Sequence, residues 1–246
     1  MKTFKNFKTL FTLSLFFIGV SILSISCSKS DSGAAAYRCL ACRNAPDALA
    51  ANDASGKGIY KGVAVGSSGT LSINIQNGVN TITANMVLDG ISASLTSNVT
   101  YVDGQAYVAP FTGTYNGTSV SITFSIAIGG AMPTVTSSSI PGHPNIVFTL
   151  YKETSTSLLE AFEGTYSKTG ESGIFNIILS TGLARWGGIV KKDVSGITGN
   201  ISGTYVNNNV IDDNGKTIGV ISVDELHGSF LDGNGATVTT TAHRTL

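Results

Sequence analysis

The chain has 246 residues, of which only 12% are charged, and its 15 basic and 15 acidic side chains cancel to a formal net charge of zero. This balance excludes a strongly basic surface of the kind that binds nucleic acid or anionic lipid. The 29 glycines, together with abundant Ser, Thr and Asn, are typical of an exported β-protein with a polar but uncharged surface.

The first 26 residues predict a secretory signal. Lys2, Lys5 and Lys8 form a positive n-region, and a largely apolar run over 10–25 follows before small residues and a cysteine. A bilayer-spanning helix needs roughly 20 apolar residues, so a retained transmembrane helix is the weaker interpretation. Removal of residues 1–26 leaves 220 residues with 12 basic and 15 acidic side chains, a net charge of about −3.

The end of this signal resembles a bacterial lipobox, where signal peptidase cleaves before a cysteine that then carries several acyl chains. Ser26 and Ile25 fit the pattern, whereas the usual leucine three residues before the cysteine is replaced by Ser24, with Leu23 one position further out. The resemblance implies lipid attachment at Cys27, and several acyl chains suffice for stable membrane anchoring. An ordinary secretory signal that ends near a cysteine is the alternative.

Residues 27–57 are expected to hold the lipid anchor, a flexible tether over 28–36 and one short helix within 44–54. Pro46 would lie near the first turn of that helix. The run Cys27-Ser28-Lys29-Ser30-Asp31 is similar to the start of lipoproteins that reach the outer face of the outer membrane. We therefore expect an outer-membrane lipoprotein, either periplasmic or surface-exposed.

Two cysteines, Cys39 and Cys42, remain once Cys27 carries lipid, and an even number suits an oxidising compartment. A thioredoxin-like centre would follow a strand and open a helix, and haem attachment would need a histidine where Arg43 stands. A zinc site would need two further ligands. A local disulfide is favoured, while a redox or metal role and free thiols stay open.

From Gly58 onward, apolar and polar residues alternate with a period of two, which predicts half-solvated antiparallel strands. The clearest apolar stripe comprises Val120, Ile122, Phe124, Ile126 and Ile128. Turn pairs that tolerate a positive φ separate the strands; they are Asn77-Gly78, Asp89-Gly90, Asn116-Gly117 and Asn214-Gly215. The pattern predicts an all-β fold of antiparallel meanders, one over 58–153 and one over 164–246.

The two halves contain a candidate internal repeat. The matching segments are Gly58-Ile59-Tyr60 with Gly164-Thr165-Tyr166, 68–73 with 172–177, 90–95 with 196–201, and, less securely, 111–115 with 226–230. Ile82 matches Trp186. If the halves are copies, equivalent residues must face inward together, because a shift of one residue would move a whole row to solvent. The expected inward sets are Ile73, Ile82 and Ile91 in the first half and Ile177, Trp186 and Ile197 in the second.

The end of the chain contains the runs 223–230, Asp232-Gly233-Asn234-Gly235 and 242–244. These resemble the closing strands of the small eight-stranded barrel of transferrin-binding-type surface lipoproteins, whose last hairpin carries an acidic-Glu-Leu-Gly-Gly-aromatic run and ends in a basic residue. His227 stands in place of the first of those glycines, and the family's handle domain is not identifiable. The resemblance implies a small up-and-down barrel in the C-terminal half and transfers no ligand.

No motif predicts a catalytic residue, a cofactor or a metal site. The histidines His143, His227 and His243 lie far apart in the sequence. The runs 212–215 and 232–235 lack the ligand spacing of a calcium loop and are interpreted as hairpin turns. A glycosidase-like carboxylate pair, with oxygens roughly 5 to 10 Å apart, would have to come from Glu160, Glu163 and Glu171.

The aromatic residues have two interpretations, cross-strand packing or a carbohydrate platform, and packing is favoured. They are Trp186, Tyr60, Tyr107, Tyr115, Tyr166 and Tyr205. We expect a non-enzymatic binding or interaction module of the cell envelope, with an envelope protein or a glycan as ligand and no nucleic-acid partner. An envelope hydrolase acting on glycans or peptides is the alternative, disfavoured because no base stands beside a nucleophile in a recognisable motif.

Overall fold

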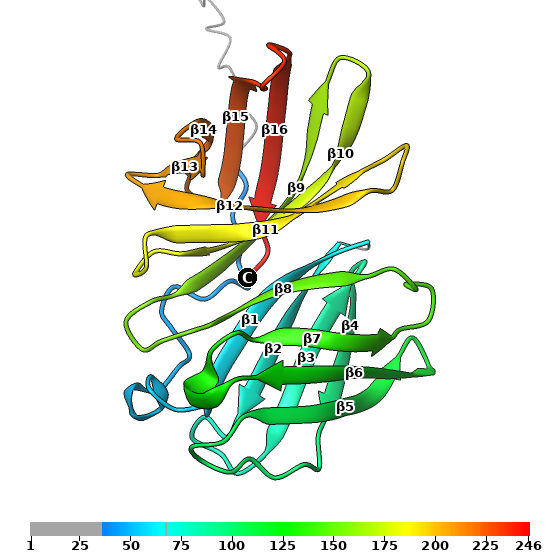
Figure 1. Cartoon of the computed structure of the whole chain (residues 1–246), viewed down its shortest axis with the longest axis vertical. Helices are drawn as coiled ribbons and strands as arrows, with labels where there is room; N and C mark the ends of the chain where they lie inside the picture. The colour runs from blue at the N-terminus through cyan, green and yellow to red at the C-terminus, as the bar shows by residue number, and fades with distance from the viewer. Residues whose placement is uncertain (1–35, 67) are drawn as a thin grey trace, which may run out of the picture. The chain divides into compact units, whose positions relative to one another are not determined.

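Two eight-stranded antiparallel sheets make up the described part of the chain, residues 36–66 and 68–246 of a computed structural model (Figure 1). The signal, Cys27 and nearly all of the expected tether lie outside the described residues. Within the described part, no helix has the length and apolar character needed to cross a membrane. The predicted all-β fold of antiparallel meanders is confirmed.

The first sheet has the strand order β7-β6-β5-β4-β3-β2-β1-β8. Its strands are β1 (Gly58–Val65), β2 (Gly69–Ile75), β3 (Ile82–Leu88), β4 (Ile91–Thr96), β5 (Tyr107–Tyr115), β6 (Thr118–Ile126), β7 (Thr134–Ser139) and β8 (Val147–Lys152). The last strand returns to pair with the first, so that Tyr60 lies opposite Lys152. In the described residues no ladder joins β7 to β8, and this sheet stays open.

The second sheet is a closed barrel with the order β10-β11-β12-β13-β14-β15-β16-β9, and the predicted barrel in the C-terminal half is confirmed. Its strands are β9 (Leu159–Lys168), β10 (Glu171–Ser180), β11 (Arg185–Lys192), β12 (Thr198–Val206), β13 (Asn209–Asp212), β14 (Thr217–Ser222), β15 (Glu225–Leu231) and β16 (Thr237–Arg244). Closure comes from β16 pairing with β9, with Ala242 opposite Gly164. Each sheet is thus an up-and-down meander whose first and last strands meet.

The expected short helix near the N-terminus is a three-residue 3-10 turn, Ala50–Asn52. Pro46 precedes this turn instead of opening an α-helix. A second 3-10 turn, Ile128–Gly130, places Ile128 beyond the end of β6, where its side chain is exposed. The last member of the predicted Val120–Ile128 stripe therefore lies outside the core.

The internal repeat is visible in the strand registers. Opposite Ile73 in β2 stands Ala84 in β3, and opposite Ala84 stands Leu95 in β4. The matched positions in the barrel pair in the same way, with Gly188 between Ile177 and Ile201. Strands β2, β3 and β4 therefore correspond to β10, β11 and β12 in the predicted alignment.

Two other matches of the repeat are corrected by these registers. Ile73 lies opposite Tyr60, but Ile177 lies opposite Phe162, so Phe162 and not Tyr166 is the counterpart of Tyr60. The segment 111–115 belongs to β5 and the segment 226–230 to β15, which are the fifth and seventh strands of their sheets. Strands built from few residue types can match in sequence by chance, and the match between 111–115 and 226–230 is of this kind.

Most of the expected inward residues are buried, and two are not. Ile73, Ile82, Ile177 and Trp186 are in the two cores. Ile91 is exposed at the start of β4, and Ile197 is exposed just before β12. Both alternate in step with the inward-facing residues of their strands. Each lies at a strand end, however, where its side chain is not packed among the core residues.

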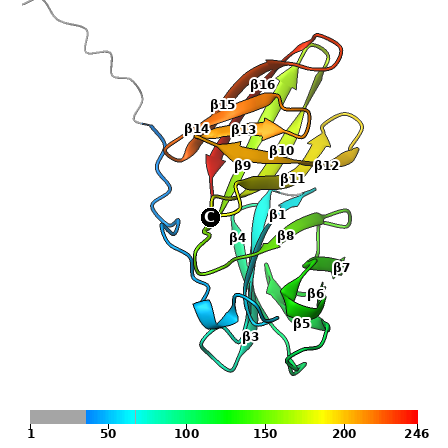
Figure 2. The ribbon, with the colours of Figure 1, turned by 60° about the vertical axis from the view of Figure 1, so that its left-hand side comes forward.

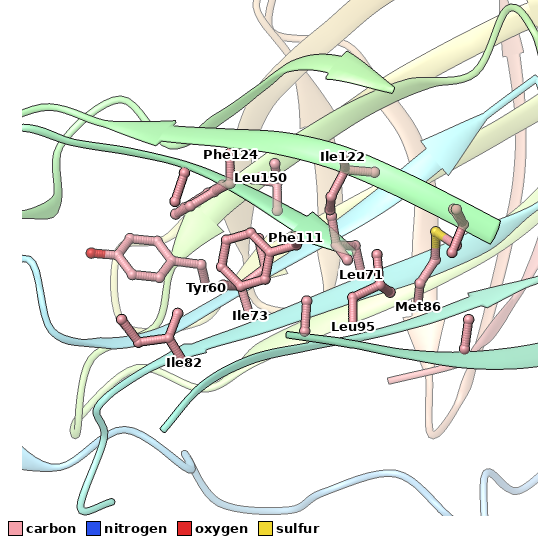
Figure 3. Close-up of a cluster of buried hydrophobic side chains, with 14 of the residues drawn as sticks. Tyr60, Leu71, Ile73, Ile82, Met86, Leu95, Phe111, Ile122, Phe124 and Leu150 are labelled. Carbon is pink, nitrogen blue, oxygen red and sulfur yellow. The ribbon is translucent and has the colours of Figure 1, made fainter. Parts of the chain in front are cut away.

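Aromatic and aliphatic side chains fill the interior of the first sheet (Figure 3). Tyr60 packs edge-on against Phe124, with ring centroids 5.3 Å apart. Strand β1 lies beside the barrel strands β9 and β10 (Figure 2). All eight of its residues are buried, because its inner face joins this core while Val63 packs against Ala161 and Ile178 of the barrel. Two-sided burial of β1 ties the two sheets together.

A buried ion pair fixes the segment between the sheets. Lys61 Nζ lies 2.7 Å from Glu153 Oε1 and 3.0 Å from Asp47 Oδ2, and Glu153 is fully buried. The carboxylate of Glu153 also accepts backbone hydrogen bonds from Asp47, Ala48 and Leu159. Buried charges are retained only with such partners, so this cluster anchors the N-terminal segment, β1 and the start of β9 at one point.

Candidate ligand cavity in the barrel

A cavity of about 380 Å³ lies inside the barrel and reaches its surface. Its inner wall is apolar and includes Phe175, Trp186, Val190, Leu226, Phe230 and Val238. Small-molecule sites have volumes of about 300 to 1,000 Å³ and are mostly apolar with a few polar groups. The barrel interior therefore has the size and the lining of a site for one small ligand.

Trp186 forms part of this wall and belongs to the core, since only 3% of its surface is exposed. Its indole Nε1–H donates a 2.9 Å hydrogen bond to the backbone carbonyl of Ile211. That carbonyl lies at an irregularity of the β13–β14 ladder, where the register shifts between Val210 and Ile211. Bulges of this kind bend a strand and leave a backbone group free for another partner. The predicted packing role of Trp186 is confirmed, and it is not an exposed sugar platform.

The barrel wall has a lateral gap beside this irregularity. Strand β12 pairs with β11 from Thr198 to Thr204, but it pairs with β13 only from Gly203 to Val206. Among the described residues, 198–202 therefore have no ladder partner on the β13 side. Beyond Asp212 the chain turns into the β13–β14 hairpin, and the cavity reaches the surface between β12 and that hairpin.

Polar side chains gather at the gap, in contrast to the apolar inner wall. They are Asn200, Ser202, Asp212, Asp213 and Asn214. Ser202 Oγ donates a hydrogen bond to Asp213 Oδ2 across the gap. The Asp212 carboxylate accepts the backbone N–H groups of Asn214 and Lys216, which is the Asx-turn role of a hairpin residue. The predicted turn at 212–215 is present.

Ion pairs join neighbouring hairpins at one end of the barrel. Glu171 lies 2.9 Å from Lys192 Nζ, and Lys168 Nζ lies 3.0 Å from Asp232. These lysines hold the pKa values of Glu171 and Asp232 below the usual range. Tyr166 OH donates a 3.1 Å hydrogen bond to Glu171, and burial first, then this bond, raises the pKa of Tyr166 to about 12. The phenol is therefore neutral at physiological pH.

Arg244 occupies the opposite end of the barrel. Its guanidinium lies 3.0 Å from Glu160 and 3.4 Å from Asp224, and its Nε donates to the Leu246 carbonyl. The backbone carbonyl of Arg244 accepts a 2.9 Å hydrogen bond from Tyr37 OH. Arg244 is almost fully buried. The buried ion pairs of Arg244 and the segment that begins at Tyr37 therefore cover this end of the barrel.

The three candidate glutamates do not form a glycosidase pair. Glu160 and Glu171 stand at opposite ends of β9 and β10, because Glu171 lies opposite Lys168, eight positions along the strand from Glu160. At about 3.3 Å per residue that is roughly 26 Å, far beyond the spacing such chemistry needs. Glu163 has the parity of the outer face, whereas Glu160 points inward toward Arg244.

The histidines fall into two places. The His143 ring lies 3.2 Å from Tyr115 OH. His227 and His243, distant in sequence, both approach Glu225, with a closest nitrogen-to-oxygen distance of 3.7 Å in each case. Cross-strand pairing of Glu225 with His243 brings them together, which no local motif could indicate. Among the described residues, no group of His, Cys, Asp or Glu side chains is arranged to hold a metal ion.

A second, smaller pocket of about 270 Å³ lies on the outer face of β9, β10 and β16. Glu163 and His243 are cross-strand neighbours there, and Ser68 contributes to the same wall. Burial raises the pKa of the Glu163 carboxyl, and a 3.1 Å hydrogen bond from Thr245 partly offsets this effect.

The other residues that the sequence analysis singled out belong to a disulfide, to the cores or to a turn. Cys39 and Cys42 are joined by a disulfide with their Cα atoms 5.4 Å apart, and Cys27 lies outside the described residues. Tyr60, Tyr107, Tyr115 and Tyr166 are buried, as cross-strand packing predicts. Asp232 accepts backbone hydrogen bonds from Asn234 and Ala236, so 232–235 is a hairpin turn.

The fold and the cavity together define a small antiparallel β-barrel protein with an internal, mostly apolar cavity, joined to an open sheet with a similar strand order. Comparison with protein-family models, with curated proteins and with solved structures finds no match to this chain.

Proposed function

We propose that this chain is a lipoprotein of the bacterial cell envelope, anchored through Cys27, whose barrel binds a small apolar ligand without transforming it. The observation that carries the proposal is the 380 Å³ cavity with its apolar wall. An eight-stranded barrel is just wide enough to hold one small ligand between its side chains. The signal pattern and the cysteine that follows it support a location in the envelope, where such ligands exchange with membranes.

The hydroxyl groups in this cavity support binding over catalysis. Thr240 Oγ1 donates a 2.8 Å hydrogen bond to the Ile218 carbonyl, and Ser202 donates to Asp213. A hydroxyl nucleophile needs a base that accepts its proton and is itself oriented by a third group. Neither hydroxyl has such an arrangement, whereas both stabilise the wall around the cavity.

Trp186 provides a direct test, because it is the only tryptophan in the chain and it lines the cavity. Titration of the purified protein with 1-dodecanol below its solubility limit should change the Trp186 fluorescence with saturation. Val238→Phe adds volume to the same wall and should weaken that binding, while Val108→Phe, at an exposed position of the first sheet, should not. A linear, unsaturable signal that is equal in both variants would rule out an internal site.

The alternative of an envelope hydrolase is favoured by one observation, the neighbouring Glu163 and His243 in the outer pocket. A carboxyl with a raised pKa beside an imidazole has the groups that general acid and base catalysis uses. Incubation with peptidoglycan fragments or peptides should then release products in the wild type and not in Glu163→Gln. Equal inactivity of the two proteins would leave the binding function as the better account.

A further inference from the structure

We infer that the barrel takes a cationic amphiphile, with its apolar body inside the cavity and its positively charged head group at the lateral gap beside Asp213. This inference rests on the proposed function and specifies its ligand class. Apolar and polar side chains line different parts of the cavity. The inner wall is apolar apart from the hydroxyls of Thr240 and Tyr166, which already donate to the Ile218 carbonyl and to Glu171. The other polar lining residues lie on β12 and the β13–β14 hairpin, on either side of the gap.

The charge of the lining points to a cation. Asp212 and Asp213 are the charged residues of the cavity lining, which contains no lysine, arginine or histidine. Lys216 is the nearest cation along the hairpin, and its Nζ donates to the Leu231 carbonyl. The other lysines at that end, Lys168 and Lys192, are bound to Asp232 and Glu171. An anionic head group at the gap would meet two carboxylates of its own sign.

The two carboxylates are not equivalent. Asp212 already accepts two backbone N–H groups in its own turn, which holds its side chain in the hairpin. Asp213 is exposed, and its Oδ2 accepts the Ser202 hydroxyl. An ammonium group could replace or share that hydroxyl, because a carboxylate has about four acceptor positions. Asp213 is therefore the residue that would contact the head group.

The position of the gap explains why an amphiphile fits better than a wholly apolar molecule. A charged group buried inside the barrel would lose its hydration at a cost of several kcal/mol. At the gap it stays in contact with water, as the charged ends of long side chains do when their stems lie on apolar surface. The unpaired edge of β12 lets the molecule span from the wall of the barrel to solvent.

Three probes with the same chain length and different heads test this directly: dodecylammonium, 1-dodecanol and dodecanoate, each titrated below its micelle concentration at pH 7. Trp186 fluorescence reports occupancy in every case. The expected order of affinity is dodecylammonium, then 1-dodecanol, then dodecanoate. Because an exposed ion pair contributes at most about 1 kcal/mol, Asp213→Asn should weaken dodecylammonium about two- to fivefold more than it weakens 1-dodecanol.

Asp193→Asn is the matched control. Asp193 is also exposed and also accepts a serine hydroxyl, from Ser172 at 2.6 Å, but it does not line the cavity. Its replacement should change none of the three affinities. Circular dichroism of both variants checks that the barrel is intact.

The outcomes separate the two proposals. If no probe binds saturably, the proposed function fails. If 1-dodecanol binds but dodecanoate binds as tightly as dodecylammonium, or if Asp213→Asn and Asp193→Asn give the same dodecylammonium affinity, the cationic specificity fails and the apolar site stands.

Discussion

The indole N–H of Trp186 in β11 reaches past β12 to the backbone carbonyl of Ile211 in β13, at 2.9 Å. The ladder between β12 and β13 stops after Gly203 and Asp212, so this side-chain bond joins the two sides of the barrel wall where backbone bonds end. Trp186 therefore stabilises the barrel at the edge of its gap and lines the cavity behind it.

Replacement of Trp186 should be among the most destabilising single changes in the barrel. We expect Trp186→Ala to lower the free energy of unfolding by about 3 to 5 kcal/mol, because it leaves a cavity in a packed core. Trp186→Phe retains most of the volume but leaves the Ile211 carbonyl unpaired, at a cost of about 1 to 3 kcal/mol. Urea denaturation followed by circular dichroism measures both.

The control for this comparison is Leu231→Ala, at a large apolar residue that is 56% exposed. It should change stability by no more than about 0.5 kcal/mol. A Trp186→Ala variant as stable as Leu231→Ala would contradict the core assignment.

The buried pair Lys61 and Glu153 predicts a strong coupling. Glu153→Gln removes the fully buried one of the two carboxylates that balance Lys61 and leaves only the more exposed Asp47 as its partner, so we expect a loss at the lower end of about 3 to 5 kcal/mol. The double variant Lys61→Met with Glu153→Gln no longer buries the lysine charge, so it should be more stable than the single variant. A double-mutant cycle from denaturation curves gives the coupling. Additive effects would show that the two side chains act independently.

Glu163 should make the protein less stable as the pH rises. Burial raises its pKa above the ordinary 4.5, so between these two values the folded state binds more protons than the unfolded state. Stability then falls as the pH increases through that window and levels off above it. Glu163→Gln removes this dependence, and its stability relative to the wild type should increase from pH 4 to pH 7.

Glu171 provides a comparison of opposite sign. The hydrogen bond from Lys192 is the main cause of its lowered pKa, so its contribution to stability is present above about pH 4.5 and is lost as the pH falls through the lowered value. Glu171→Gln should therefore destabilise the protein at pH 7 and approach the wild type in acid. If the stability of Glu163→Gln and of Glu171→Gln, each relative to the wild type, changed with pH in the same direction, the opposite pKa shifts of Glu163 and Glu171 would be contradicted.

Lipid attachment at Cys27 is tested in cells. Cys27→Ser should abolish labelling with an alkyne fatty acid and release the protein from the membrane fraction, because a single cysteine would carry all of the acyl chains. Ser28→Ala, next to the cleavage position, should label normally. Labelling of the Cys27→Ser protein at the wild-type level would refute the lipobox interpretation.

The sequence by itself determined the strands in which apolar and polar residues clearly alternate, their turns and part of the repeat, but not β7, which lies in a proline-flanked stretch. Alternation with a period of two shows which side chains share a face, and positive-φ pairs such as Asn116-Gly117 show where the chain reverses. Both are local properties of the backbone. The matched spacing of Ile73 with Ile177 and of Ile82 with Trp186 was readable for the same reason. No local property indicates how far along a strand the core extends. The prediction that Ile91 and Ile197 face the core is therefore wrong, and both are exposed.

Only the tertiary structure decided where the barrel wall opens and which charges are buried. The closed barrel of the C-terminal half was indicated by the resemblance of its last strands and not by their alternation. Closure depends on pairing between the first and last strands and on the long-range ladders between them, which no alternation pattern encodes. Lys61 has the parity of a solvated residue, yet it is buried because β1 packs against the barrel on its outer face. The cavity likewise arises from strands that are distant in the chain, since its wall combines Phe175, Trp186, Leu226 and Val238. Such a site exists only once non-local contacts have brought those residues together.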